Sequence, residues 1–185
     1  MMSVATYALL FLWVFFPCEE ALAQNGRENE KAERRNCLYT QFSLFMEENV
    51  HKTTNYRKGI LVPVNTEVVL INKDEDDIKL RMNDGTKLDL ENIEPFSGEK
   101  IDGIFRRTLS TKRVDLSAFS EKEKRAIMSG EVEVGMSRAA VLVAMGYPPK
   151  HKTPSLQGNQ WRYWQNRFNT FVVIFEGDRV KAIKD

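Results

Sequence analysis

The sequence predicts an α+β fold, in which a C-terminal layer of two short helices lies on a three-stranded antiparallel sheet. A small antiparallel, SH3-like β unit is expected before it. Two observations support this fold class. Helix start and stop residues occur twice between positions 117 and 149, and three segments with the residue alternation of strands follow between 160 and 183.

The N-terminus is typical of an export signal. Residues 4–17 form an almost wholly apolar run of about 14 residues, whereas crossing a bilayer takes about 20. Ala21-Leu22-Ala23 follows as a small-x-small cleavage site, so we expect residues 1–23 to be a signal peptide cleaved after Ala23. Met1 to Tyr7 contains no lysine or arginine, which leaves an uncleaved N-terminal anchor as the alternative.

The segment after the signal is polar, and residues 24–38 are predicted to be a flexible lead. Cys18 falls in the signal after Pro17, a poor context for lipidation, so the mature chain keeps only Cys37 and forms no internal disulfide. Its charge is 27 − 24, or +3, because Glu19 and Glu20 leave with the signal. The charges are interspersed, which argues against a nucleic-acid partner.

Residues 39–95 are predicted to be the small β-rich unit. The segment 67–72 is β-branched and apolar, and 78–82 alternates apolar with basic residues. Asn83-Asp84-Gly85 then provides a tight turn into 86–90, which predicts a hairpin. The acidic run 74–77 lacks the glycine and glutamate spacing of an EF-hand, so it is interpreted as a solvated turn.

Residues 96–116 are predicted to link the two units, with a short strand or irregular structure over 101–109. Residues 117–185 form the second predicted domain. Ser120 to Glu123 matches a capping box, and Gly130 is placed to end that helix. A second helix is expected from Ser137 to Gly146, after which Pro148 and Pro149 prevent its continuation. Strands are expected over 160–165, 170–176 and 179–183.

This order of elements resembles the SmpA/OmlA (BamE-like) family of small envelope proteins. The residues that carry the resemblance open the second helix, close it and form the final strands: Gly135, Met136, Ser137, Val141, Gly146, Tyr147, Pro148, Trp161, Tyr163 and Phe175 through Val180, including Gly177. The resemblance covers roughly 119–183. It implies a periplasmic protein, or one at the periplasmic face of the outer membrane of a Gram-negative bacterium. Outer-membrane assembly components are the implied partners, and peripheral membrane association is possible.

Two features depart from that family. Its members in the assembly machine are anchored through a lipidated cysteine, whereas Cys18 lacks that context. They also consist of little more than this domain, whereas a β-rich unit precedes it here.

A cluster of aromatic and basic residues near the C-terminus is the predicted partner-binding site, because Trp, Tyr and Arg dominate interface energetics. The cluster comprises Trp161, Arg162, Tyr163, Trp164, Arg167 and Phe168. The alternative is that this second face of the sheet packs on the chain's own β unit.

No catalytic constellation, metal cluster or cofactor motif is recognisable in the sequence. His51 and His151 both lie in polar segments and are interpreted as solvated surface residues. We therefore expect a non-catalytic protein that acts in envelope assembly or integrity through protein binding. The alternatives are an inhibitor-like periplasmic module and a cell-wall-binding module.

Overall fold

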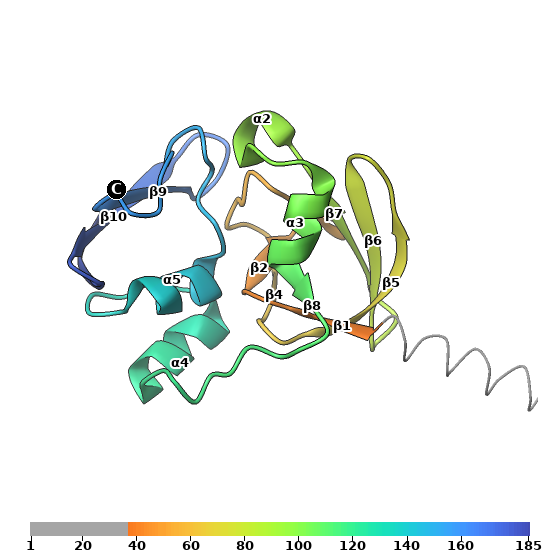
Figure 1. Cartoon of the computed structure of the whole chain (residues 1–185), viewed down its shortest axis with the longest axis horizontal. Coiled ribbons are helices and arrows are strands. Elements are labelled where there is room, and N and C mark those ends of the chain that lie inside the picture. Colours follow the sequence, from red (N-terminus) through yellow and green to blue (C-terminus); the bar gives the residue numbers. More distant parts are fainter. Residues whose placement is uncertain (1–36) are drawn as a thin grey trace, which may run out of the picture. The chain divides into compact units, whose positions relative to one another are not determined.

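The structure, a computed structural model, describes residues 37–185 (Figure 1). The described residues contain eleven strands and four short helices. The strands are β1 (Cys37–Thr40), β2 (Leu44–Met46), β3 (Val50–Lys52), β4 (Ile60–Val62), β5 (Glu67–Lys73), β6 (Asp77–Met82), β7 (Lys87–Glu91), β8 (Leu109–Ser110), β9 (Gln160–Trp164), β10 (Thr170–Glu176) and β11 (Arg179–Lys184). The helices are α2 (Glu94–Ser97), α3 (Ile101–Thr108), α4 (Glu121–Ser129) and α5 (Arg138–Met145).

The largest sheet has six strands in the order β3-β7-β6-β5-β1-β8. All neighbours are antiparallel except β3, which runs parallel to β7. The predicted hairpin is confirmed, since β6 pairs with β7 and Ile78 lies opposite Leu90. Both of these side chains and Leu80 are buried, so the period-2 pattern directs one face of the sheet into a core.

Helix α3 covers part of this core, where Ile101 and Ile104 join the buried cluster of the sheet. The helix leads directly into β8, which pairs with β1. The expectation of a strand or irregular structure over 101–109 is therefore wrong, because most of that segment of the expected 96–116 linker is helical. Its apolar residues at positions 101, 104 and 105 follow a helical rather than an alternating period.

A second core lies between α4, α5 and the three-stranded sheet β11-β10-β9. The predicted capping box is confirmed: the side chain of Ser120 accepts a hydrogen bond from the Glu123 N–H, and Glu123 reaches back to the Ser120 backbone. Gly130 ends α4 in the left-handed conformation at φ 66°. The predicted strand pairs of the C-terminal meander are also present, with β10 in the centre.

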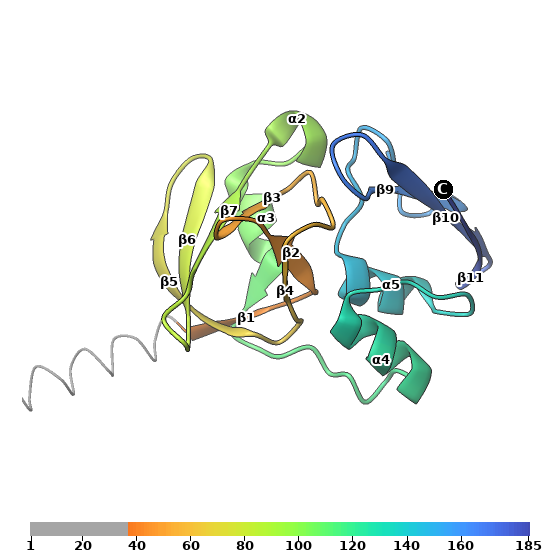
Figure 2. The ribbon, with the colours of Figure 1, turned by 180° about the vertical axis from the view of Figure 1, so that it is seen from behind.

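The described residues 37–185 belong to one compact unit (Figures 1 and 2). Buried polar contacts join its two cores. Ser43 donates its hydroxyl to the Ile127 carbonyl at 2.7 Å, and its N–H to the Val143 carbonyl at 2.9 Å. The side-chain amide of Asn55 donates to the Met145 carbonyl at 2.7 Å. The β-rich half therefore satisfies the carbonyl groups at the C-terminal ends of α4 and α5.

The α+β fold class predicted for the whole chain is wrong, because the described residues are mostly β. A six-stranded mixed sheet with α3 against it replaces the small antiparallel SH3-like unit. Strands β2 and β4 form a separate two-stranded sheet that was not predicted from the sequence. The physical reason is that strands such as β2, β3 and β8 are only two or three residues long, too short to show an alternation.

Several N-terminal predictions lie outside the described residues: the signal peptide 1–23, Cys18 and positions 24–36 of the polar lead. Cys37 and Leu38 do not belong to a flexible lead, because they lie in β1 and pair with Val69 and Val68. Burial raises the pKa of the Cys37 thiol to about 11, and the hydrogen bond to Glu67 adds to this effect. None of the helices described within residues 37–185 is long and apolar enough to cross a membrane.

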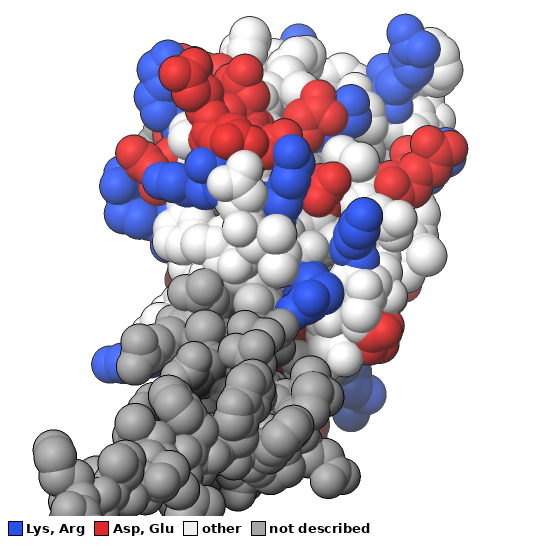
Figure 3. Space-filling model, turned by 90° about the vertical axis from the view of Figure 1, so that its right-hand side faces the viewer, with Lys and Arg blue, Asp and Glu red and all other residues white. Residues whose placement is uncertain are grey.

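The acidic run 74–77 occupies the turn between β5 and β6 and the first residue of β6. Figure 3 shows the surface of the molecule on the right-hand side of Figure 1. Acidic side chains gather in the upper part of this surface, with lysine and arginine side chains among them. Lys79 lies 3.9 Å from Asp74 and 3.8 Å from Asp77, and Lys73 pairs with Asp102. Within residues 37–185, no group of three His, Cys, Asp or Glu side chains could hold a metal ion.

Candidate protein-binding groove

The predicted partner-binding cluster is divided by the sheet into buried and exposed members. Trp161 and Tyr163 are 1% and 0% exposed and belong to the second core. The Trp161 indole donates to the Leu156 carbonyl at 3.2 Å, and the Tyr163 hydroxyl donates to the Gly146 carbonyl at 3.0 Å. Their assignment to a partner surface is therefore wrong, because β9 turns these two rings toward α5 and the Gly146 turn.

Arg162 and Trp164 lie on the opposite face of β9. Arg162 is exposed and donates to the Thr170 hydroxyl at 3.0 Å. Trp164 is half-buried, with its ring 6.2 Å from the ring of Tyr56 and 6.4 Å from that of His151. Through Tyr56, Trp164 contacts the β-rich half of the chain. The alternative stated above, that the second face of the sheet packs on the chain's own β unit, therefore describes Trp164.

Arg167 and Phe168 occupy the turn between β9 and β10. The side-chain oxygen of Asn166 accepts from the N–H groups of Phe168 at 2.9 Å and Asn169 at 3.0 Å, which stabilises the turn. Phe168 is 81% exposed, and the Arg167 guanidinium lies 5.4 Å from the centre of its ring. Arg162, Arg167 and Phe168 are thus the exposed members of the predicted cluster, and of these Arg167 and Phe168 lie in the turn.

The turn borders a hollow made with the loops of the β-rich half. The hollow has two compartments of about 450 and 560 Å³ that share Glu47, Tyr56, Lys58 and Arg167 in their walls. We call it the Tyr56 groove. The first compartment is further lined by Phe45, Val50, Lys52, Thr54, Ile93 and Phe96, and the second by Asn166, Phe168 and Asn169.

The walls of the groove are held by tight loop conformations. Asn55 has φ 57°, and its side chain bonds the Met145 and Tyr147 carbonyls, which secures the residue next to Tyr56. Gly59 has φ 94°, and a Cβ there would lie 2.1 Å from the Met46 carbonyl oxygen. Only glycine fits this approach, so the close contact between β2 and the loop that carries Tyr56 and Lys58 depends on Gly59.

The charges of the groove are mainly positive. Lys58 pairs with Glu47 at 2.6 Å, and Lys52 pairs with Glu91 at 2.9 Å. The hydrogen bond that Lys58 donates to the Glu47 carboxylate raises the pKa of Lys58. Arg167 has no acidic partner among residues 37–185, since its contact is the ring of Phe168. One cation at the rim is thus available to an anionic group.

Sequence reasoning missed Tyr56, Thr54 and Phe96, because no periodicity marks them. Thr54 and Tyr56 lie in a loop, and Phe96 lies in the short helix α2. The available signal was an aromatic residue between a polar run and the basic pair Arg57-Lys58, just before Gly59. His51 was also misjudged. It is 4% exposed, its Nδ1 lies 2.8 Å from the Phe45 carbonyl oxygen, and burial lowers its pKa to about 4.

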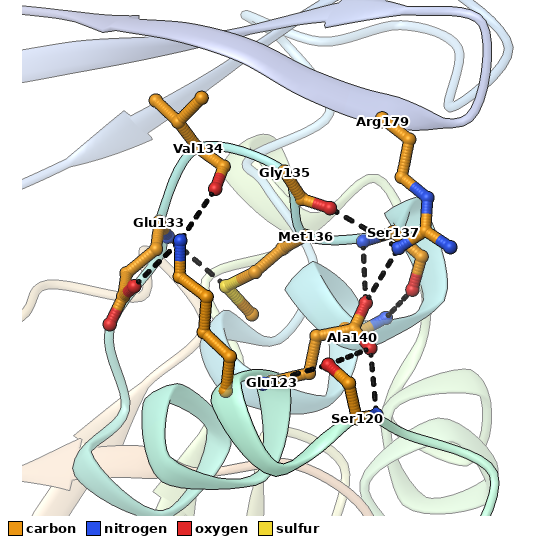
Figure 4. Close-up of polar contacts among 10 residues, drawn as sticks. Ser120, Glu123, Glu133, Val134, Gly135, Met136, Ser137, Ala140 and Arg179 are labelled. Atoms are coloured by element: carbon orange, nitrogen blue, oxygen red, sulfur yellow. Dashed lines mark hydrogen bonds and ion pairs between the residues drawn. The ribbon is translucent and has the colours of Figure 1, made fainter.

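Three residues of the predicted structural motif, Gly135, Met136 and Ser137, belong to a network of polar contacts away from the groove (Figure 4). Ser137 is the N-cap of α5, and the Gly135 N–H donates to the Val180 carbonyl. The carboxylate of Glu123 accepts from the Ser137 N–H at 2.8 Å and from Arg179 at 3.1 Å. The network therefore connects both helix starts to β11.

The other motif residues also have structural positions. Met136 is 1% exposed, and Pro148 is buried just after α5. Gly146 and Gly177 have positive φ values of 70° and 59° at a helix end and a hairpin turn. None of these residues lines the groove.

Comparison with known proteins adds no relative: no family model matches the chain, and neither a curated protein nor a solved structure shows significant similarity to it.

Proposed function

We propose that this chain is a non-catalytic protein that binds a protein partner through the Tyr56 groove. The observation that carries the proposal is the 81% exposure of Phe168 at the edge of the groove, beside Arg167. An isolated phenylalanine so exposed has no role in the core. Aromatic residues and arginine are the types enriched where proteins bind one another.

We further propose that the protein is exported and works at the cell envelope, in outer-membrane assembly or integrity. The apolar N-terminal run and the Ala21-Leu22-Ala23 site support export. The resemblance to the SmpA/OmlA family over 119–183 supports the role. Ser137 and Gly177, two residues on which that resemblance depends, lie at the start of a helix and in a hairpin turn.

Photo-crosslinking in cells tests the proposed surface. Phe168 is replaced by a photoreactive phenylalanine analogue, and Ile71, an exposed residue of β5 far along the chain from the groove turn, is replaced in a matched control. We expect a defined protein adduct from position 168, identified by mass spectrometry as an outer-membrane assembly component, and none from position 71. An identical adduct pattern at both positions, or no adduct at either, contradicts the proposal.

Export is tested separately by mass spectrometry of the mature N-terminus from fractionated cells. Cleavage after Ala23 and recovery in the envelope fraction support export. Recovery of the intact chain from the cytosol contradicts it.

A further inference from the structure

We infer that the Tyr56 groove recognises an acidic peptide segment of its partner, with an apolar side chain in the first compartment and a carboxylate at Arg167. This inference rests on the proposed function, because it assumes that the groove binds protein. It adds the chemical class of the ligand.

The first compartment suits a large apolar side chain. Its volume of about 450 Å³ falls within the usual range of ligand pockets, about 300–1,000 Å³. Phe45, Ile93 and Phe96 contribute apolar wall, and Tyr56 stands where the two compartments meet. The His151 ring contacts Phe96 at 4.6 Å between ring centres, which holds that wall in place.

Polar atoms in and beside the groove are left without a partner. Thr54 lines the first compartment and is 5% exposed, and its hydroxyl has no hydrogen-bond partner in the part of the chain that the structure describes. The indole N–H of Trp164, whose ring contacts Tyr56, is likewise buried and unpaired among these residues. Trp164 lines neither compartment, so Thr54 is the residue of the groove wall whose hydroxyl is unpaired among the described residues. Buried polar groups are normally satisfied, and this hydroxyl is therefore the place where a ligand would supply a bond. A peptide backbone offers both a donor and an acceptor for a hydroxyl.

The charge of the groove selects an acidic ligand. Lys52 and Lys58 already have carboxylate partners, whereas Arg167 contacts only an aromatic ring among residues 37–185. A guanidinium binds a carboxylate through two parallel hydrogen bonds, which makes a carboxylate its natural complement. Arg167 belongs to the walls of both compartments, so a ligand that extends from one to the other passes beside it.

Binding of two synthetic peptides to the full chain tests the inference by isothermal titration. The probes are blocked pentapeptides of alternating aspartate and phenylalanine, and the same peptide with asparagine in place of aspartate. We expect the acidic peptide to bind about tenfold more tightly, with an advantage that shrinks as salt is added. Arg167→Gln should remove the advantage. Arg162→Gln, an exposed arginine of β9 outside the groove lining, should keep it.

The outcomes separate this inference from the proposed function. Equal affinity for the two peptides, or an unchanged preference in Arg167→Gln, overturns the acidic ligand, while an adduct at position 168 still supports protein binding. Failure of both peptides to bind, together with no adduct, overturns both proposals.

Thr54→Val keeps the shape of the side chain and should lower the affinity for both peptides several-fold without lowering the melting temperature. Unchanged affinity in this variant overturns the role of the hydroxyl.

Discussion

Replacing Glu123 by glutamine should destabilise the protein by about 2 kcal/mol at pH 7. The carboxylate is 7% exposed at the residue level and accepts from the Ser120 N–H, the Ser120 hydroxyl, the Ser137 N–H and Arg179, at 2.8–3.1 Å. Burial alone would raise the pKa of Glu123, but the hydrogen bonds from Ser137 and Ser120 outweigh it and lower the pKa to about 2. The fall from 4.5, at about 1.4 kcal/mol per pKa unit, gives an upper value of about 3 kcal/mol. Partial solvent screening reduces it to about 2.

The same network predicts a dependence of stability on pH. The folded-state pKa lies below the unfolded value of 4.5, so the unfolded chain binds the proton first as the pH falls. The stabilisation is therefore complete above about pH 5 and is lost progressively as the pH falls toward 2. Glu123→Gln should lose this part of the pH dependence, because glutamine has no proton to bind in that range.

Urea denaturation at pH 7, 4 and 2.5 measures both effects. Glu121→Gln is the matched control, since Glu121 lies on the same helix turn with its side chain 79% exposed and its ion pair in the described part of the chain is with Lys124. We expect its unfolding curve to match that of the original protein at pH 7. A Glu123→Gln protein as stable as this control at pH 7 would refute the idea that the carboxylate connects α4, α5 and β11.

Three further predictions concern burial, backbone and titration. Trp161→Ala should lower the free energy of unfolding measured in urea by about 4 kcal/mol, because the ring is buried against Phe175. Phe168→Ala should change it by less than about 0.5 kcal/mol, because Phe168 is exposed. Similar values for the two variants would contradict the buried and exposed positions of these residues. Gly146→Ala should cost at least about 2 kcal/mol, since its φ is 70° and a Cβ would lie 2.6 Å from the Phe42 ring; a neutral result in the same assay would be inconsistent with this packing. Burial lowers the pKa of His51 to about 4, so between pH 6.5 and 4 the unfolded chain binds a proton that the folded chain does not. The free energy of unfolding should therefore fall as the pH falls through this range, by at most about 3 kcal/mol, and His51→Gln should remove the dependence in this range alone. An NMR titration that shows a pKa near 6.5 for His51 would disprove the prediction.

Local signals in the sequence were strong wherever the backbone itself decides the structure. The Ser120 cap, the Gly130 stop and the Asn83-Asp84-Gly85 turn each depend on interactions within four residues, and all three are confirmed. The fold class was wrong because it depends on contacts between distant segments. Strand β8, for example, is two residues long and exists because it pairs with β1.

The candidate site was predictable only in part, for a related reason. Alternation along β9 shows that Trp161 and Tyr163 share a face, but not which face is buried. The choice is made by α5 and the Gly146 turn, whose carbonyl accepts the Tyr163 hydroxyl. An aromatic residue in a strand is therefore as good a candidate for the core as for an interface, and only the turn residues Arg167 and Phe168 escaped this ambiguity.

The groove itself follows from how the two cores are joined. Asn55 donates to the carbonyl groups at the end of α5, and this bond brings Tyr56 against Trp164, the last residue of β9 before the turn into β10. The contact between the two halves thus places an apolar wall of one half beside Arg167 of the other, which has no acidic partner among residues 37–185. Replacing Asn55 by leucine should disturb this alignment, because a buried carbonyl would lose its donor. The variant should therefore weaken peptide binding even though Asn55 does not line the groove, and unchanged binding would show that the halves align without this bond.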